Sequence, residues 1–230
     1  MNEFVESSSY FFVALTVVAF GISSALQKKW KIALLNPIAI GALLVFGILK
    51  LCGISNEAYQ AGCQVLTYLL TPATVCLALA LYRQFRALKS HLPAIAAGIL
   101  CGVLCSLGSV YLMGKLLGLD QIILRSLLPK SVTAAVGLAL SEEIGGIIAI
   151  TAAAVSITGI LGNMLGPVLC KLFRIKEPIA QGVAFGTASH VIGTSKASEM
   201  SQLAGAVGSL SLTLAGLFTS AALSFLAPYL

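Results

Sequence analysis

The chain has 230 residues, of which 58% are hydrophobic and only 10% are charged, and its mean hydropathy is +1.00. An ordinary soluble domain is about 45–50% apolar and about 25% charged, so this composition excludes a water-soluble domain, a nucleic-acid-binding protein, a secreted disulfide scaffold and a disordered chain. The net charge of +6 is explained by basic residues, which collect in the cytoplasmic loops of membrane proteins. The sequence therefore predicts an all-α polytopic membrane protein.

Six uncharged stretches are long enough to cross a bilayer. The hydrocarbon core is about 30 Å thick, and a helix of about 20 apolar residues spans it. In chain order the stretches are 7–27, 32–49, 58–82, 90–114, 144–170 and 200–230. Pro37 and Pro72 are expected to break or kink the second and third of these helices.

Two further stretches, 131–141 and 178–195, are shorter, flanked by charge and rich in Ser, Thr and Gly. We predict that they belong to two re-entrant or broken segments, 119–143 and 178–199, each followed by a spanning helix. Such an order, entered once from each side, is the pattern of an inverted repeat whose broken segments build a substrate site near the membrane midplane. The whole chain, 1–230, is interpreted as one transporter-like domain with a four-helix part, 1–118, and a second part, 119–230.

Basic clusters in three loops predict the orientation. They follow the first, third and fifth spanning helices and consist of Lys28, Lys29 and Lys31, then Arg83, Arg86 and Lys89, then Lys171, Arg174 and Lys176. Because basic loops stay in the cytoplasm, we expect all three clusters there, which puts the N-terminus outside. The first residues include Glu3 and Glu6 and no basic residue, so they are not interpreted as a signal peptide.

The cysteines and histidines predict neither a metal site nor a cofactor. None of the six cysteines forms a Cys-x-x-Cys pair, and only His91 and His190 could join them, so reduced, buried thiols are expected. No hydrolase elbow or phosphate-binding loop is present, and the neighbours Ser189 and His190 do not form a catalytic triad. We therefore expect a protein that is not an enzyme.

The first polar segment carries Lys130, Ser131 and Thr133 directly after Pro129. At membrane depth these groups need partners, because each unsatisfied polar group there costs several kcal/mol. Lys130 suits a carboxylate, as do the free backbone N–H groups at the start of a half-helix. The segment ends with Glu142, which is interpreted as lining the cavity. In the alternative interpretation the segment is an outside loop whose charged side chains are simply solvated.

The second polar segment contains Thr187, Ser189, His190, Thr194 and Lys196 among three glycines. Glycine lets the backbone approach a ligand closely, so we interpret these five side chains, together with those of the first segment, as a substrate-binding site. A histidine titrates near neutral pH, which would allow proton coupling. The alternative role for the histidine is a structural hydrogen bond.

Other polar and small residues lie inside the apolar stretches. Asn36 and Asn163 either line the cavity or form hydrogen bonds between helices. Three Gly-x-x-x-Gly pairs, at 98–102, 162–166 and 182–186, have the spacing by which membrane helices pack closely.

Six short motifs spread over the chain carry a resemblance to a known family. They are Leu34-Leu35-Asn36-Pro37, Leu128-Pro129-Lys130-Ser131-Val132-Thr133, Ile144-Gly145-Gly146-Ile147, Gly159-Ile160-Leu161-Gly162, Gly186-Thr187-Ala188-Ser189-His190 and Ile192-Gly193-Thr194. These motifs resemble the LrgB/CidB family of bacterial inner-membrane proteins, over essentially the whole chain. Two places depart from the family pattern: Ala134-Ala135 replaces a common Thr-Pro, and Lys196 stands at a common arginine, which keeps the charge but loses the bidentate grip on a carboxylate.

The resemblance implies two bodies of function. One is transport of small carboxylates, such as pyruvate uptake or glycolate/glycerate exchange. The other is a holin/antiholin-like system, in which the protein acts with a small LrgA/CidA-like membrane partner in murein hydrolase regulation and cell lysis. Transport gives the polar segments a physical purpose, so we favour a secondary transporter of small monocarboxylates by alternating access, with the regulator as the alternative. Expected partners are the carboxylate, membrane lipid, the LrgA/CidA-like protein and a second copy of the chain, and no nucleic acid.

Overall fold

The computed structural model describes residues 9–30, 37–69, 72, 75, 76, 82, 89 and 91–227. Within these residues the chain forms helices and no strand, which confirms the all-α prediction. The chain divides into two compact units, Met1–Cys76 and Leu77–Leu230. The division predicted between residues 118 and 119 stays a prediction.

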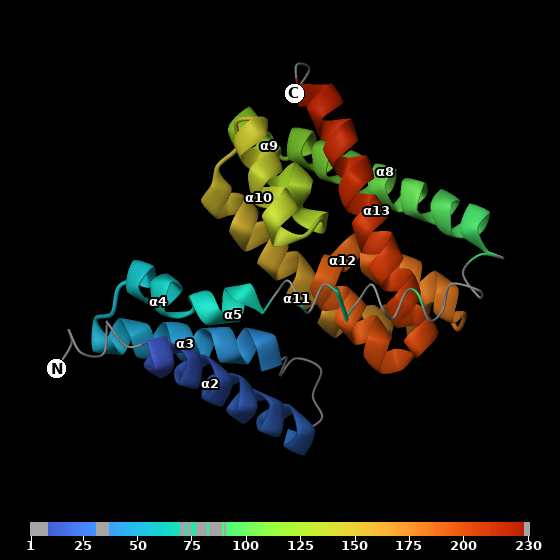
Figure 1. Cartoon of the computed structure of the whole chain (residues 1–230). Helices are drawn as coiled ribbons and strands as arrows, with labels where there is room; N and C mark the ends of the chain where they lie inside the picture. The colour runs from blue at the N-terminus through green and yellow to red at the C-terminus, as the bar shows by residue number, and fades with distance from the viewer. Residues whose placement is uncertain are drawn as a thin grey trace. The chain divides into compact units, whose positions relative to one another are not determined.

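The first unit is built on two helices that lie side by side (Figure 1), α2 (Ser9–Trp30) and α3 (Pro37–Cys52). Two short helices follow, α4 (Asn56–Gly62) and α5 (Gln64–Tyr68). The small apolar core of this unit consists of Phe12, Ala19, Val45, Leu49 and Cys63. The Phe12 ring packs so closely on Gly62 that a β-carbon there would overlap it.

The second and third predicted spans differ from the structure. α3 covers Pro37–Cys52, 16 residues, and Pro37 stands in its first turn, where the fixed φ of proline suits a helix. It ends three residues later than predicted, and residues 32–36 of the predicted span lie outside the described residues. The third stretch, predicted as one helix over 58–82, starts inside α4, which Ser55 caps by accepting a hydrogen bond from the Ala58 N–H (3.1 Å). α4 ends at Gly62, and much of the remaining stretch lies outside the described residues.

In the part of the chain that the structure describes, four helices are long and apolar enough to cross a membrane. They are α2, α8 (Leu92–Leu116), α11 (Ile148–Leu172) and α13 (Gln202–Leu226). They correspond to the first, fourth, fifth and sixth predicted spans, with ends shifted by two to four residues. The chain is therefore a multi-pass membrane protein.

Between α8 and α11 the chain forms three short helical pieces rather than one helix. These are α9 (Gln121–Leu127), the 3-10 turn η1 (Leu128–Ser131) and α10 (Ala134–Glu143). Pro129 lies in the 3-10 turn with φ −82° and ψ 15°, and proline has no N–H to continue a helical ladder. Val132 and Thr133 are extended before α10 begins. A broken segment was predicted here, and the structure confirms the break.

The second broken segment is α12 (Pro178–Met200), whose helical path is interrupted at Ser189 and His190. Residues 191–200 continue the helix for ten residues, the length of α10, and the 25-residue helix α13 follows, just as the 25-residue α11 follows α10. The order of elements therefore recurs along the chain. The opposite orientation of the two copies in the membrane stays a prediction.

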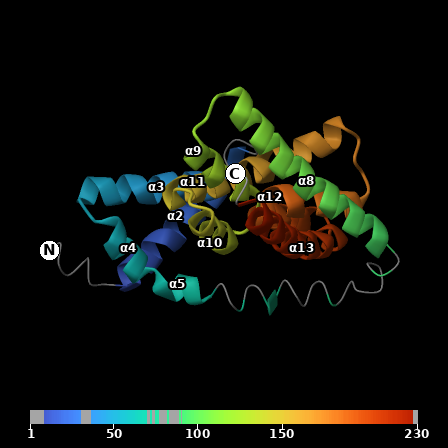
Figure 2. The same cartoon turned by 90° about the horizontal axis from the view of Figure 1, so that it is seen from above.

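α12 lies at the centre of the second unit. It packs against α13, α11 and α8 (Figures 1 and 2), and also against η1. The main core of this unit contains Ile95, Ile99 and Val103 of α8 and Ala206, Val207 and Leu223 of α13. Both breaks are therefore held inside a frame made of the three long helices of this unit.

Candidate functional site

The break at η1 carries a cation and two hydroxyls. Ser131 is buried, and its Oγ lies 2.8 Å from Oγ of Ser106 on α8. The half-buried Lys130 donates from Nζ to Ser131 Oγ at 3.2 Å. Lys130 forms no ion pair with any carboxylate in the described part of the chain. This arrangement leaves a positive charge, partly removed from water, beside hydroxyls that can donate to an anion.

The break in α12 is buried and pinned to α11. His190 is only 4% exposed, and its Nε2 lies 3.0 Å from the Val155 carbonyl oxygen, which can only accept, so the ring nitrogen donates. On the other side of the break, Asn163 Nδ2 donates to the Ile192 carbonyl (3.1 Å). The Asn163 side chain thus forms the hydrogen bond between helices that was one of its two predicted roles.

Three glycines of α11 make room for the side chains at the break. A β-carbon at Gly159 would lie 2.6 Å from His190 Cε1, and one at Gly162 would overlap the Ser189 side chain. A β-carbon at Gly166 would overlap the Phe185 ring. Glycine is therefore required at each position by close approach of α12, as the Gly-x-x-x-Gly spacing predicted for 162–166.

Glycines of α8 and α13 approach α12 from its other sides. A β-carbon at Gly102 would lie 3.0 Å from Thr187 Oγ1, and one at Gly208 would lie 3.2 Å from the Thr194 methyl group. A glycine of α12 itself also allows the close approach of α13, because a β-carbon at Gly186 would overlap the Gly208 carbonyl oxygen. Small residues on three helices therefore surround α12.

The predicted hydroxyl residues fall into two groups. Thr187 and Thr194 are buried and donate to carbonyl oxygens of their own helix, Val183 at 2.7 Å and His190 at 2.8 Å. Ser189 is 4% exposed, and its side chain forms no hydrogen bond among the described residues. Its Oγ is not one of the fully enclosed polar atoms without a partner, which among the described residues are Arg125 Nε and Ser211 Oγ. Thr133 lies at the N-terminal end of α10 without a side-chain capping bond. The Ser189 and Thr133 hydroxyls are therefore available to a ligand.

Three residues predicted to bind substrate or line the cavity either lie away from the breaks or are outside the residues that the structure describes. Lys196 forms an ion pair with Glu199, Nζ to Oε2 2.6 Å, near the end of α12. Glu142 is exposed at the end of α10. Asn36 lies outside the described residues.

The two breaks face one another within the second unit. η1 packs against α12, and both breaks adjoin Val155 of α11. A β-carbon at Gly137 would lie 3.2 Å from the Pro129 carbonyl oxygen and 3.3 Å from a Val155 methyl group, and the His190 ring is bonded to the Val155 carbonyl. The structure thus brings Lys130 and Ser131 together with Ser189 and His190, and we take these four residues as the candidate site. Among the described residues, no three His, Cys, Asp or Glu side chains gather as metal ligands would.

Sequence reasoning missed the residues that hold the first broken segment in place. The Thr151 hydroxyl of α11 donates to the Ser126 carbonyl (2.8 Å) and lies 2.6 Å from the Ser141 hydroxyl. Ser126 Oγ in turn accepts from the Ile147 N–H (2.7 Å). All three hydroxyl residues are fully buried. In the sequence, the sign that could have identified these three residues is that their hydroxyls occur in apolar surroundings.

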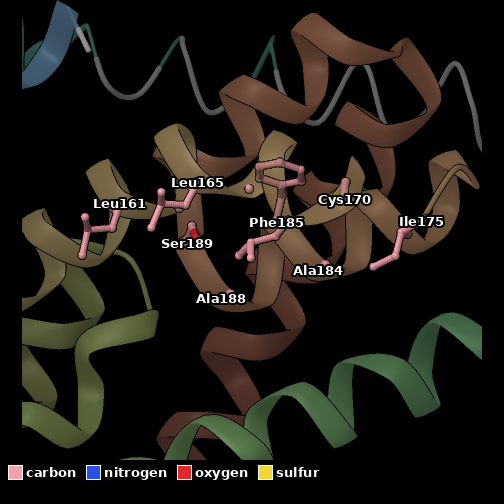
Figure 3. Close-up of a pocket in the computed structure, with 11 residues that line it drawn as sticks. Leu161, Leu165, Cys170, Ile175, Ala184, Phe185, Ala188 and Ser189 are labelled. Atoms are coloured by element: carbon pink, nitrogen blue, oxygen red, sulfur yellow. The ribbon is translucent and has the colours of Figure 1, made fainter. Parts of the chain in front are cut away.

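Two cavities border the first half of α12. One, of about 310 Å³, lies between α11 and α12 and reaches Ser189 (Figure 3). The other, of about 540 Å³, lies between α8 and α12, with Thr187 among its lining residues and His91 and Glu177 near the ends of these helices. Both cavities therefore approach the break in α12.

Comparison with known proteins gives one consistent result. The model of the LrgB-like family matches residues 16–229. Proteins named antiholin-like protein LrgB from Bacillus mycoides (strain KBAB4), Bacillus cereus (strain B4264) and Bacillus anthracis (strain CDC 684 / NRRL 3495) are each 35% identical to the chain over 222 residues, which is 96% of this chain and 96% of the relative. No solved structure matches the chain. By this match over nearly its full length, the chain belongs to the LrgB-like family.

Proposed function

We propose that this chain acts as an antiholin-like regulator of murein hydrolase activity and cell lysis in a bacterial inner membrane. The observation that supports this function is the name carried by relatives that match 96% of the chain. The names support the regulator better than they support transport. In this role the chain would act with a small LrgA/CidA-like membrane protein.

The regulator is tested in a Bacillus strain that lacks its own LrgB-like protein. Expression of this chain together with an LrgA/CidA-like protein should slow autolysis and lower murein hydrolase activity on zymograms of cell extracts. Either protein expressed alone is the control. Autolysis that is unchanged by the pair would contradict the regulator.

A specific feature of the structure favours a second function, transport of a small monocarboxylate. Lys130 is half-buried, has only the Ser131 hydroxyl as a hydrogen-bond partner and forms no ion pair within the described residues. A charge inside a membrane protein normally has a partner and marks a substrate or ion pathway. An anionic substrate would supply the missing partner. The half-buried Lys130 without an ion pair is the observation that carries this second proposal.

The carboxylate would lie between the two breaks. There it would meet Lys130, the Ser131 and Ser189 hydroxyls and the free N–H groups at the start of α10 beside Thr133. Helix N-termini favour anions because their first N–H groups lack partners and the helix dipole is positive there. In this arrangement protein donors replace the water that the carboxylate loses at membrane depth.

Uptake into proteoliposomes tests the transporter. Labelled pyruvate, glycolate and lactate should enter vesicles that contain the chain, and Lys130→Met should weaken uptake by at least about tenfold, the effect of a charge-assisted hydrogen bond worth roughly 1.5–3 kcal/mol. Lys115→Met removes an exposed lysine from the same unit and should leave uptake unchanged. If both variants transport equally well, Lys130 does not hold the substrate.

Proton coupling is tested separately at His190. If the ring exchanges a proton during transport, His190→Gln should flatten the pH dependence of uptake while the protein stays folded. A pH profile that matches the unsubstituted protein would leave His190 with its structural bond to the Val155 carbonyl and no role in coupling.

A further inference from the structure

The cavity between α8 and α12 follows one stripe of α8. Its wall on this helix includes His91, Gly98 and Gly102, and its volume is about 540 Å³. Residues four apart lie on the same face of a helix. The next position on the stripe after Gly98 and Gly102 is therefore Ser106, whose Oγ lies 2.8 Å from Ser131 Oγ in the first break. On α8 the cavity thus ends about one turn before the residue that contacts the candidate site.

The other end of the cavity lies where α8 and α12 begin. His91 and Glu177 stand at the N-cap positions of these two helices, and both line the cavity. Both are exposed. The basic clusters that end with Lys89 and Lys176 precede the two helices in the sequence, and such clusters are predicted to lie in the cytoplasm. The mouth of the cavity is therefore expected on the cytoplasmic side.

A close contact between the two helices marks the inner end of the cavity. Val183 and Thr187 line the cavity from α12. A β-carbon at Gly98 would lie 3.1 Å from a Val183 methyl group, and one at Gly102 would lie 3.0 Å from Thr187 Oγ1. Thr187 is only 6% exposed. The contact of Gly102 with Thr187 is therefore the constriction between the cavity and Ser131.

We propose that the α8–α12 cavity is the aqueous route between the cytoplasm and the candidate site, closed at its inner end by the contact of Gly102 with Thr187. This inference rests on the transport function proposed above and gives that function its path. Small side chains leave space for the route, since Ala94, Ala180 and Ala184 also line the cavity. Interrupted backbone at membrane depth is tolerated where it lines a water-filled space, and the break in α12 follows directly after the constriction.

Reaction of single cysteines with a charged, membrane-impermeant methanethiosulfonate tests whether the cavity holds water. The thiolate is the reactive form, and a thiol in apolar surroundings ionises less readily. Ala94→Cys and Val183→Cys place a thiol on each wall, in a chain whose exposed native cysteines are replaced by serine. The matched control is the same chain with only Cys101 restored. This exposed thiol lies on α8, three residues after Gly98 and outside the cavity lining.

The labelling has two expected results. In inside-out membrane vesicles, which present the cytoplasmic side, the thiols at positions 94 and 183 should react at least about tenfold faster than Cys101, because a thiol that faces lipid forms less thiolate. The reagent attached at position 183 should then block uptake of labelled pyruvate into proteoliposomes, because it fills the path. The reagent attached at Cys101 should leave uptake unchanged.

Three outcomes would overturn the inference, and they can be told apart. If the two cavity thiols react no faster than Cys101, lipid fills the groove and the route lies elsewhere. If they react but the attached reagent leaves uptake unchanged, the cavity holds water without being the path. If they react but the unlabelled chain takes up no acid, the transport function itself fails and the route fails with it.

Discussion

The backbone of His190 takes a conformation that side chains rarely adopt, with φ 42° and ψ −136°. Such a residue costs about 1–3 kcal/mol and persists only where its surroundings fix it. Here the ring bond to the Val155 carbonyl and the space left by Gly159 fix it. A glycine would hold the same backbone without strain, so the histidine ring supplies something that glycine lacks.

Two substitutions separate the ring from the backbone at this position. His190→Gly and His190→Ala both lose the bond to Val155, but only glycine accepts the positive φ freely. The glycine variant should therefore be the more stable of the two, by roughly 1 kcal/mol, as measured by thermal unfolding in detergent. At the exposed neighbour Val191, alanine should instead be more stable than glycine, by about 1 kcal/mol. The same order at both positions would contradict strain at His190.

The contact between Gly162 and Ser189 predicts a second stability effect. Gly162→Ala places a methyl group where the Ser189 side chain lies, and such overpacking typically costs about 1–3 kcal/mol. The matched control is Gly108→Ala on α8, where nothing lies within 4 Å of the added β-carbon, so alanine should stabilise that helix by roughly 0.5–1 kcal/mol. Midpoints of thermal unfolding that shift alike in both variants would contradict the close approach of α12.

At the scale of elements, the buried hydroxyls of Ser126, Ser141 and Thr151 attach the first broken segment to α11. α9 and α10 have only 7 and 10 residues, and helices this short are marginal without tertiary support. The Thr151 hydroxyl touches both of them, through the Ser126 carbonyl and the Ser141 hydroxyl. One side chain of a long helix therefore connects two short ones.

Removal of this hydroxyl should loosen the segment locally. Thr151→Val keeps the shape of the side chain but leaves the Ser126 carbonyl and the Ser141 hydroxyl short of a partner, which costs about 1–3 kcal/mol. Amide hydrogen exchange over residues 121–143 should become faster. Thr151→Ser should restore slow exchange, and Ser156→Ala, an exposed hydroxyl on the same helix, should have no effect. Equal exchange in the valine variant would show that the segment is held by other contacts.

The two broken segments were predictable from sequence because their composition conflicts with a lipid-facing helix. Pro129 explains the first break, since proline removes a donor from the helical ladder. The position of the second break was not predictable, because neither Ser189 nor His190 prevents helix formation. What fixes it is packing on α11: His190 lies against Gly159 and Ser189 against Gly162, which are 31 and 27 residues earlier in the chain.

The candidate site was predictable only in part. Hydroxyl residues in apolar segments look the same in a sequence, yet the Thr187 hydroxyl donates within its own helix while the Ser189 side chain forms no hydrogen bond among the described residues. Lys196 was placed with the site because of its charge, although its spacing of three from Glu199 is that of an ion pair along a helix. Which hydroxyls and cations face a ligand depends on the break, and the break depends on tertiary contacts.

At the scale of the whole molecule, the four long apolar helices and the shorter apolar helix found among the described residues establish a multi-pass membrane protein. The orientation of the chain rests on the basic loops. Lys171 lies in the last turn of α11, Arg174 and Lys176 follow directly after it, and Lys28 and Lys29 lie in the last turn of α2. If both ends face the cytoplasm, the two broken segments enter from opposite sides, as an inverted repeat requires.

Labelling of single cysteines with a membrane-impermeant maleimide tests this orientation. Cysteines placed at positions 29, 86 and 174 should react only from the cytoplasmic side, and one at position 3 only from outside. The exposed native thiols of Cys52, Cys76, Cys101 and Cys105 must first be replaced by serine, and this cysteine-depleted protein is the control. Reaction at position 174 from outside would exclude the inverted repeat.

The glycines around α12 also limit how this protein can evolve. Every replacement for glycine is larger, so Gly159, Gly162 and Gly166 can mutate only toward more volume, and there the volume is already occupied by His190, Ser189 and Phe185. A tolerated change on α11 therefore needs a compensating loss on α12, in the same lineage and at the facing position. Drift at this interface is expected to proceed in pairs, whereas single substitutions accumulate freely on the faces turned to lipid.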